Sequence, residues 1–289
     1  MTLIAVLIAL ALEHFVISLD HIRGFGWFDR YTRWLELKFE GKAFWGGPLG
    51  VIATLLVPLL VLILAAKLLG QVSPVLVFIL AIAVFVYCLG PDLNTWLSRY
   101  IDSLESRDEA TRAEMEQALG GGDESSGRMD KNRIISRVLL RSHEHFFGIL
   151  FWFIVLGMAG ALLYRLVIQL YDNYGDIHGG YAESVRTLHG IMMWPSAHLL
   201  ALGFGLSGSL VHAFEAWRGV EGEPLECCED VIVSSGYGAL QYEVEEDGDT
   251  DDWHDVYINW LGETRGLLNR TLIVWLTVLG IMTIGGYLV

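Results

Sequence analysis

The chain has 289 residues, of which 53% are hydrophobic and 18% are charged, against about 25% charged residues in soluble domains. Its formal net charge of −15 comes without a basic face, which excludes nucleic acid as a partner because phosphate binding needs clustered lysine and arginine. The three cysteines, Cys88, Cys227 and Cys228, form no C-x-x-C pair, so we expect reduced thiols and neither a zinc site nor a disulfide framework.

Six apolar segments are candidate membrane spans, because about 20 helical residues cross the hydrocarbon layer of a bilayer. They are 3–19, 48–69, 74–89, 146–170, 191–214 and 271–289. Pro195, glycines and histidines interrupt the fifth segment, which either spans, kinks or only half enters the membrane. The sequence therefore predicts an all-α, polytopic helical membrane protein with about five to six transmembrane helices.

Three features inside these segments carry expectations of their own. The short link 70–73 predicts that the second and third segments form a helical hairpin, and Pro58 predicts a bend in the second. In the fourth segment, small residues such as Gly157 and Gly160 predict close approach of another helix.

Most lysines and arginines lie in the segments 20–45 and 91–145, which places both loops in the cytoplasm and the protein in the bacterial inner membrane as a multi-pass protein. With six spans the chain alternates, so the link after residue 170 and both termini fall on the outer side. If the segment 191–214 does not span, the C-terminus is cytoplasmic. The lipid bilayer is the one partner that the composition requires. The sequence leaves the oligomeric state and any small-molecule or protein ligand open.

The polar stretches complete the organisation of a single membrane domain, 1–289. Aromatic and basic residues of 27–39 predict a helix in the headgroup region within 20–45. The loop 91–145 should be helical from Asn94 to about Leu119 and again from about Lys131. The acidic stretch 215–269 is predicted to be a cytoplasmic loop, which its carboxylates keep exposed to water.

A few polar residues lie at or inside the apolar segments. Glu13 interrupts the first segment, where a carboxylate is either functional or paired near the membrane edge. We expect a polar cluster at the cytoplasmic face, formed by Glu13, Asp20, His21, Asp92 and Glu144.

Other polar residues have simpler interpretations. His143, Glu144 and His145 do not have the H-E-x-x-H spacing that places two ligands on one helix face, so we predict no metal site. Arg165 is expected to extend to the membrane surface, and His198 is ambiguous between packing and function. No phosphate-binding loop or nucleophile motif is present, so the sequence identifies no catalytic residue and no cofactor.

Several motifs resemble the AmpE family, an inner-membrane protein family linked to β-lactamase regulation, within a wider group that includes the cobalamin-biosynthesis CobD/CbiB proteins. The matching positions are Trp152, Gly157, Gly160, Tyr164, Arg165, Trp194 and His198, with Gly90-Pro91 and the final Gly285-Gly286. The resemblance covers nearly the whole chain and implies the fold of a polytopic membrane protein.

Two departures from these families bear on function. AmpE-like sequences read W-x-P-A-R-L where this chain reads Trp194-Pro195-Ser196-Ala197-His198-Leu199. The CobD/CbiB enzymes read Y-R-x-x-N-T-L-D where this chain has Tyr164-Arg165-Leu-Val-Ile168-Gln169-Leu170-Tyr171, without the asparagine and the aspartate. The leading hypothesis is therefore a non-enzymatic signalling protein of the AmpE type. The alternative is a diverged ATP-dependent ligase of the CobD/CbiB class, which would use nucleotide and Mg²⁺ on an unknown substrate.

Overall fold

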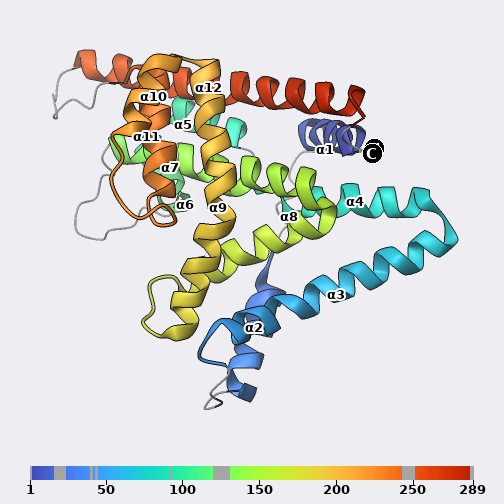
Figure 1. The fold of residues 1–289 in the computed structure, drawn as a ribbon. Helices are drawn as coiled ribbons and strands as arrows, with labels where there is room; N and C mark the ends of the chain where they lie inside the picture. The colour runs from blue at the N-terminus through green and yellow to red at the C-terminus, as the bar shows by residue number, and fades with distance from the viewer. Residues whose placement is uncertain are drawn as a thin grey trace. The chain divides into compact units, whose positions relative to one another are not determined.

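Helices form the whole of the regular structure that the computed structural model describes, which covers residues 2–15, 24–39, 42, 45–90, 93–119, 131–242 and 251–286 (Figure 1). The chain divides into two compact units. Unit one holds residues 1–90, 144–196 and 282–289, and unit two holds 91–143 and 197–281. Four helices have the length and hydropathy of membrane spans, at Pro48–Val72, Pro74–Glu105, Asn132–Tyr174 and Val256–Ile284. The chain is therefore an all-α, multi-pass membrane protein.

The first predicted span is helical as α1, Thr2–Phe15. Its 14 residues are about 21 Å long, less than the roughly 30 Å of the hydrocarbon layer. The rest of the predicted segment lies outside the described residues, so its crossing of the membrane stays a prediction. Ala5, Val6 and Ala9 are buried, and the helix packs on α4.

The predicted hairpin of the second and third segments is confirmed as α3, Pro48–Val72, and α4, Pro74–Cys88 (Figure 1). Only Ser73 separates the two helices, fewer residues than the expected four-residue link. Its N–H donates to the carbonyl of Leu69 at the end of α3, and its Oγ accepts the N–H of Val75 at the start of α4 at 3.3 Å. One residue therefore provides a hydrogen-bond partner for the backbone at the ends of both helices. Pro58 lies within the continuous helix α3.

The fourth segment forms a hairpin rather than one straight span. Helix α8, Gly148–Tyr174, breaks at Gly157, whose φ of 66° and ψ of −154° are not helical, and Figure 1 shows its two arms turning back on each other. A Cβ on Gly160 would collide with the carbonyl of Trp152, and one on Gly148 would collide with the ring of Tyr164. In a straight helix these pairs would be about 12 and 24 Å apart.

The small residues of this segment therefore have a different role from the predicted one. Gly157 supplies a backbone turn that other residues rarely adopt, and Gly160 admits the opposite arm of its own helix rather than another helix. The residues that resembled a helix-packing pattern build the turn and the crossing of the hairpin.

The first arm of α8 runs antiparallel to α4, because the tilted rings of Phe85 and Phe153 are 4.5 Å apart and the N–H of Gly90 donates to the carbonyl of His145 at 3.0 Å. Continued along both helices, this register puts Gly157 about eight residues, or about 12 Å, short of the turn at Ser73. The α8 hairpin thus enters the apolar layer beside α4 and turns back before it reaches the level of the α3–α4 turn.

The far end of α8 meets α2, Gly26–Phe39, and this corrects the predicted topology. Asp29 Oδ1 accepts hydrogen bonds from Asn173 at 2.9 Å and Gln169 at 3.2 Å, and Glu36 accepts one from Tyr174 at 3.3 Å. The link after residue 170 therefore lies on the same side of the membrane as the segment 27–39, not on the opposite side. The predicted alternation of loops between the two sides of the membrane is wrong at this point. It counted the two arms of α8 as one crossing of the membrane, whereas they enter and leave on the same side.

Unit two contains α5, Leu93–Glu105, α6, Glu109–Ala118, and α7, Lys131–Ser142. The predicted helix 94–119 is in fact two helices, because Arg107 has a positive φ of 57° and Asp108 caps α6 through the N–H of Thr111 at 3.2 Å. These hydrogen bonds lower the pKa of the exposed Asp108 carboxyl. The predicted helical start near Lys131 is confirmed.

The remaining helices of unit two replace the predicted acidic loop with ordered structure. They are α10, Leu210–Arg218, α11, Cys228–Leu240, and α12, Asp251–Ile284, so the expectation of a loop over 215–269 is wrong for most of its length. Gly238 packs on the carbonyl of His212, and Gly236 packs on the side chain of Leu139, so α11 lies close to both α10 and α7.

The fifth predicted segment is shared by α9, Gly180–Ser207, and α10. The helix stops at Gly208, where a Cβ would collide with the carbonyl of Ala239, and the N–H of Ser209 donates to that same carbonyl at 2.9 Å. Helix α9 is not among the four described helices with the hydropathy of a span.

We expect Gly157→Ala to destabilise the protein by about 1–3 kcal/mol, because an L side chain is strained at this φ and ψ. Thermal unfolding of the purified protein in detergent measures the effect. Gly280→Ala is the control, since its position is helical and a Cβ there meets nothing within 4 Å. Equal melting temperatures for the two variants would contradict the hairpin turn.

Candidate functional site at the base of the α8 hairpin

A π-helical turn, His143–Phe147, joins α7 to α8 at the point where the hairpin begins. One extra residue in such a turn rotates the side chains that follow, and π-turns are frequent at functional sites. His143 is fully buried, whereas Glu144 and His145 are partly exposed. Among the described residues, no group of three or more His, Cys, Asp or Glu side chains is arranged to hold a metal ion.

Arg165 and His145 face each other across the base of the hairpin. The guanidinium Nη1 lies 2.8 Å from Nδ1 of His145, although the two residues are 20 apart in the chain. Arginine can only donate, so Nδ1 accepts and a neutral His145 ring carries its proton on Nε2. The guanidinium also lies over the ring of Phe25, with Cζ 5.2 Å from the ring centroid. Arg165 thus contacts two side chains of unit one, and its extension to the membrane surface stays a prediction.

The end of α4 closes this site from one side. A Cβ on Gly90 would overlap the ring of His145, and the Gly90 N–H bonds the His145 carbonyl, so only glycine lets the two backbones approach so closely. Of the predicted polar cluster, only Glu144 has a described side chain, and it lies on the π-turn next to this contact. The side chains of Glu13, Asp20, His21 and Asp92 lie outside the described residues, so their convergence stays a prediction.

Five of the seven family-motif positions gather on the hairpin. Gly157 is its tip, Trp152 and Gly160 cross below the tip, and Tyr164 and Arg165 lie at the base. The Trp152 indole N–H also donates to the carbonyl of Met192 at 3.0 Å, which fixes the first arm to α9.

The other two motif positions lie apart from this group. Trp194 is 44% exposed on α9, and His198 contacts the ring of Trp217 in unit two at a centroid distance of 5.2 Å. The motif thus combines a structural hairpin with positions elsewhere on α9.

The positions where the CobD/CbiB pattern has asparagine and aspartate have packing roles here. Ile168 is 1% exposed, and Tyr171 stacks on His189 with ring centroids 4.0 Å apart and nearly parallel planes. Burial lowers the pKa of His189 to about 4, and its Nε2 has no hydrogen-bond partner within the described part of the chain. Neither position offers a carboxylate or an amide to a ligand.

The polar contacts between α2 and the second arm of α8 were not predicted from the sequence. Asp29, Gln169 and Asn173 are far apart in the chain, and no local spacing joins them. The i, i+4 spacing of Gln169 and Asn173 did place two amides on one helix face, which was the available signal for a shared acceptor.

Comparison with known proteins gives one partial relative. Over 111 residues, 37% of this chain, the sequence is 32% identical to the cobalamin biosynthesis protein CobD of Chromobacterium violaceum. The match covers 35% of that protein, so the chain spans about a third of the length of the curated relative it matches. No family model and no solved structure match the chain. The similarity supports a relationship to CobD, whereas membership of the AmpE family stays a prediction.

A double-mutant cycle tests the contact between Arg165 and His145. We expect His145→Ala and Arg165→Ala to be coupled by about 1 kcal/mol or more in unfolding free energy, because each removes the same charge-assisted hydrogen bond. Denaturant unfolding of the two single variants and the double variant measures this coupling. Arg165→Ala combined with His212→Ala is the control, since His212 bonds Ser209 instead. Additive effects for the first pair would contradict the contact.

The buried His189 predicts loss of stability on acidification. Its pKa is lower in the folded chain than the usual 6.5, so unfolded chains bind the proton first, and stability falls as the pH drops from about 6.5 toward 4. The loss at pH 5 should be about 2 kcal/mol. Melting curves of wild type and His189→Phe between pH 7.5 and 5 measure it. The variant, which keeps a ring against Tyr171, should lose less stability over that interval, and a parallel loss would contradict the assignment.

Proposed function

We propose that this chain is a regulatory protein of the bacterial inner membrane, of the AmpE type, built on a scaffold related to CobD. In this role it would respond to the state of the cell wall and affect β-lactamase induction. The positive residues of 20–45 and 91–145 support the cytoplasmic membrane as its location.

The observation that carries this proposal is the structural role of residues 164–171. Tyr164 and Arg165 keep the pattern of the CobD/CbiB enzymes and build the base of the hairpin, Tyr164 being fully buried against Gly148. The two positions that should carry polar groups instead hold Ile168 and Tyr171, which pack. A scaffold that keeps its structural residues and fills its polar positions with packed side chains supports a role other than amide ligation.

The base of the hairpin offers a means of regulation. His145 on the π-turn is bonded from two sides: its ring accepts from Arg165 on the second arm of α8, and its carbonyl accepts from the N–H of Gly90 at the end of α4. A ligand or partner that changed the Arg165–His145 contact would alter the packing of three helices at once. A membrane regulator requires an element that a ligand can switch between two arrangements, and we propose that this contact is that element.

Deletion of the gene in a host with an inducible β-lactamase tests the proposal. We expect altered induction, restored by the wild-type gene and not by Arg165→Ala, provided that immunoblots show equal amounts of both proteins in the membrane. Arg218→Ala, whose guanidinium lies over the exposed Phe214, is the matched control and should restore induction. Unchanged induction after deletion would refute this function.

The match to CobD favours a second candidate, a diverged ATP-dependent ligase. It predicts that the purified protein binds ATP with Mg²⁺ and that its gene restores cobalamin synthesis in a strain lacking CobD. Isothermal titration with MgATP and growth of the complemented strain measure both properties. We expect neither binding nor growth, and a positive result in both would replace the first proposal by the second.

A further inference from the structure

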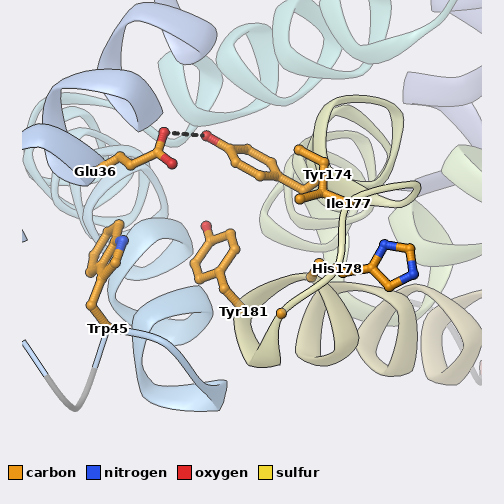
Figure 2. Close-up of a pocket in the computed structure, with 8 residues that line it drawn as sticks. Glu36, Trp45, Tyr174, Ile177, His178 and Tyr181 are labelled. Carbon is orange, nitrogen blue, oxygen red and sulfur yellow. Dashed lines mark hydrogen bonds between the residues drawn. The ribbon is translucent and has the colours of Figure 1, made fainter. Parts of the chain in front are cut away.

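A pocket opens in unit one where α2, the turn before α3 and the loop between α8 and α9 meet (Figure 2). Its cavity volume is about 180 Å³. Its main lining residues are Glu36, Trp45, Tyr174, Ile177, His178 and Tyr181. The pocket is separate from the base of the hairpin, and neither the sequence motifs nor the similarity to CobD assigns it a role.

Three aromatic rings form one wall of the pocket. Trp45 stacks on Tyr181 with centroids 5.7 Å apart and on Phe39 with centroids 5.4 Å apart, and Tyr174 meets Tyr181 edge to face at 5.3 Å. The faces of such rings carry a partial negative charge and attract cations, most strongly ammonium groups that are already partly desolvated. Figure 2 shows the Tyr181 ring between those of Trp45 and Tyr174, with the Tyr174 hydroxyl directed toward Glu36.

Glu36 adds a full negative charge at the rim. Its Oε2 accepts a hydrogen bond from the Tyr174 hydroxyl at 3.3 Å, and no described lysine or arginine forms an ion pair with it. Lys38, the nearest lysine in sequence, instead has its Nζ over the ring of Trp34 at 4.6 Å. Arg33, one turn earlier on α2, also acts electrostatically on Tyr174, but more weakly than Glu36. A carboxylate beside electron-rich rings therefore favours a cation over an anion in the pocket.

The pocket is held in shape by contacts that do not require a ligand. A Cβ on Gly180 would overlap the carbonyl of Gly46, so α9 begins directly against the turn before α3. Arg186 donates to the carbonyls of Gly175 and Ile177 at 2.8 and 3.1 Å and thereby fixes the loop. The Tyr181 hydroxyl lies 3.2 Å from that of Thr54 on α3. Preformed walls reduce the entropy lost when a ligand binds.

The surroundings of the pocket indicate a membrane surface. On α2, Trp34 is 53% exposed and Leu37 is 73% exposed, and at the start of the spanning helix α3, Leu49 is 62% exposed. Apolar side chains this exposed, next to the end of a membrane span and to tryptophan and tyrosine rings, are typical of the headgroup region of a bilayer. An ammonium group that reaches the pocket from this direction is attached to a lipid.

We propose that this pocket, formed by Glu36, Trp45, Tyr174 and Tyr181, binds the ammonium headgroup of a zwitterionic phospholipid such as phosphatidylethanolamine. The Tyr174 and Tyr181 rings contact the cation, Trp45 supports Tyr181 from behind, and Glu36 balances the charge. The acyl chains lie along the exposed residues of α2 and α3. The occupant anchors α2 to the bilayer and ties it to the end of α8.

Native mass spectrometry of the full-length protein tests the proposal. The protein is purified from nanodiscs that contain equal amounts of phosphatidylethanolamine and phosphatidylglycerol with the same acyl chains. We expect wild type to retain the ethanolamine lipid over the glycerol lipid by about tenfold, and Glu36→Gln to lose this preference. Glu183→Gln, which removes an exposed acid of α9 that does not line the pocket, should retain it.

A second pair of variants isolates the ring contribution. Tyr181→Phe keeps the ring and should keep most of the preference, whereas Tyr181→Leu should reduce it about tenfold, with melting temperatures reported for both. Equal retention of both lipids by wild type overturns the proposal.

Free ethanolamine and choline, titrated into detergent-solubilised protein without lipid, distinguish a lipid from a soluble amine. Binding of these cations that depends on Glu36, with no lipid preference in nanodiscs, overturns the lipid assignment. Each outcome is independent of β-lactamase induction, so this proposal and the regulatory function can fail separately.

Discussion

The architecture depends on one constraint: inside a bilayer the chain must satisfy its own backbone hydrogen bonds, since the hydrocarbon offers no partner. Long helices meet this requirement along most of the chain. Where a helix ends within the apolar part of unit one, a specific substitute appears, such as Ser73 bonding both α3 and α4. At Gly157 the helix is interrupted, and the turn folds α8 against itself and against α4.

The same fold-back explains why the candidate site exists. A straight helix would hold Arg165 about 30 Å from His145, whereas the hairpin brings them to 2.8 Å. Glycine at positions 90, 148 and 160 allows backbones and rings to approach where a Cβ would collide. The contact between Arg165 and His145 is therefore a consequence of the turn at Gly157. His145 lies twelve positions before this glycine, at the base of the first arm, and Arg165 lies eight positions after it, at the base of the second arm. The guanidinium held in this way is stabilised by the side chains of His145 and Phe25.

The two features of unit one that carry proposals lie at different places and use different chemistry. At the base of the hairpin, a cation, Arg165, meets a neutral imidazole and the ring of Phe25. At the pocket, a carboxylate, Glu36, lies beside three rings and is suited to an external cation. Helix α2 connects the two regions, because Asp29 bonds the second arm of α8 one or two turns before Glu36 reaches the pocket.

Composition and hydropathy were enough to determine the class of protein, the α3–α4 hairpin and the amphipathic helix 26–39, since each follows from runs and periods of apolar residues in a local stretch. The resemblance to the AmpE and CobD/CbiB families, rather than composition, predicted Gly157, Gly160, Tyr164 and Arg165 as a motif. What composition and hydropathy could not supply was the direction of the chain after Gly157, because a helical hairpin and a straight span have the same hydropathy. That direction was decided by the conformation of one glycine and by contacts such as Gly90 with His145 and Asp29 with Asn173, which join residues distant in sequence.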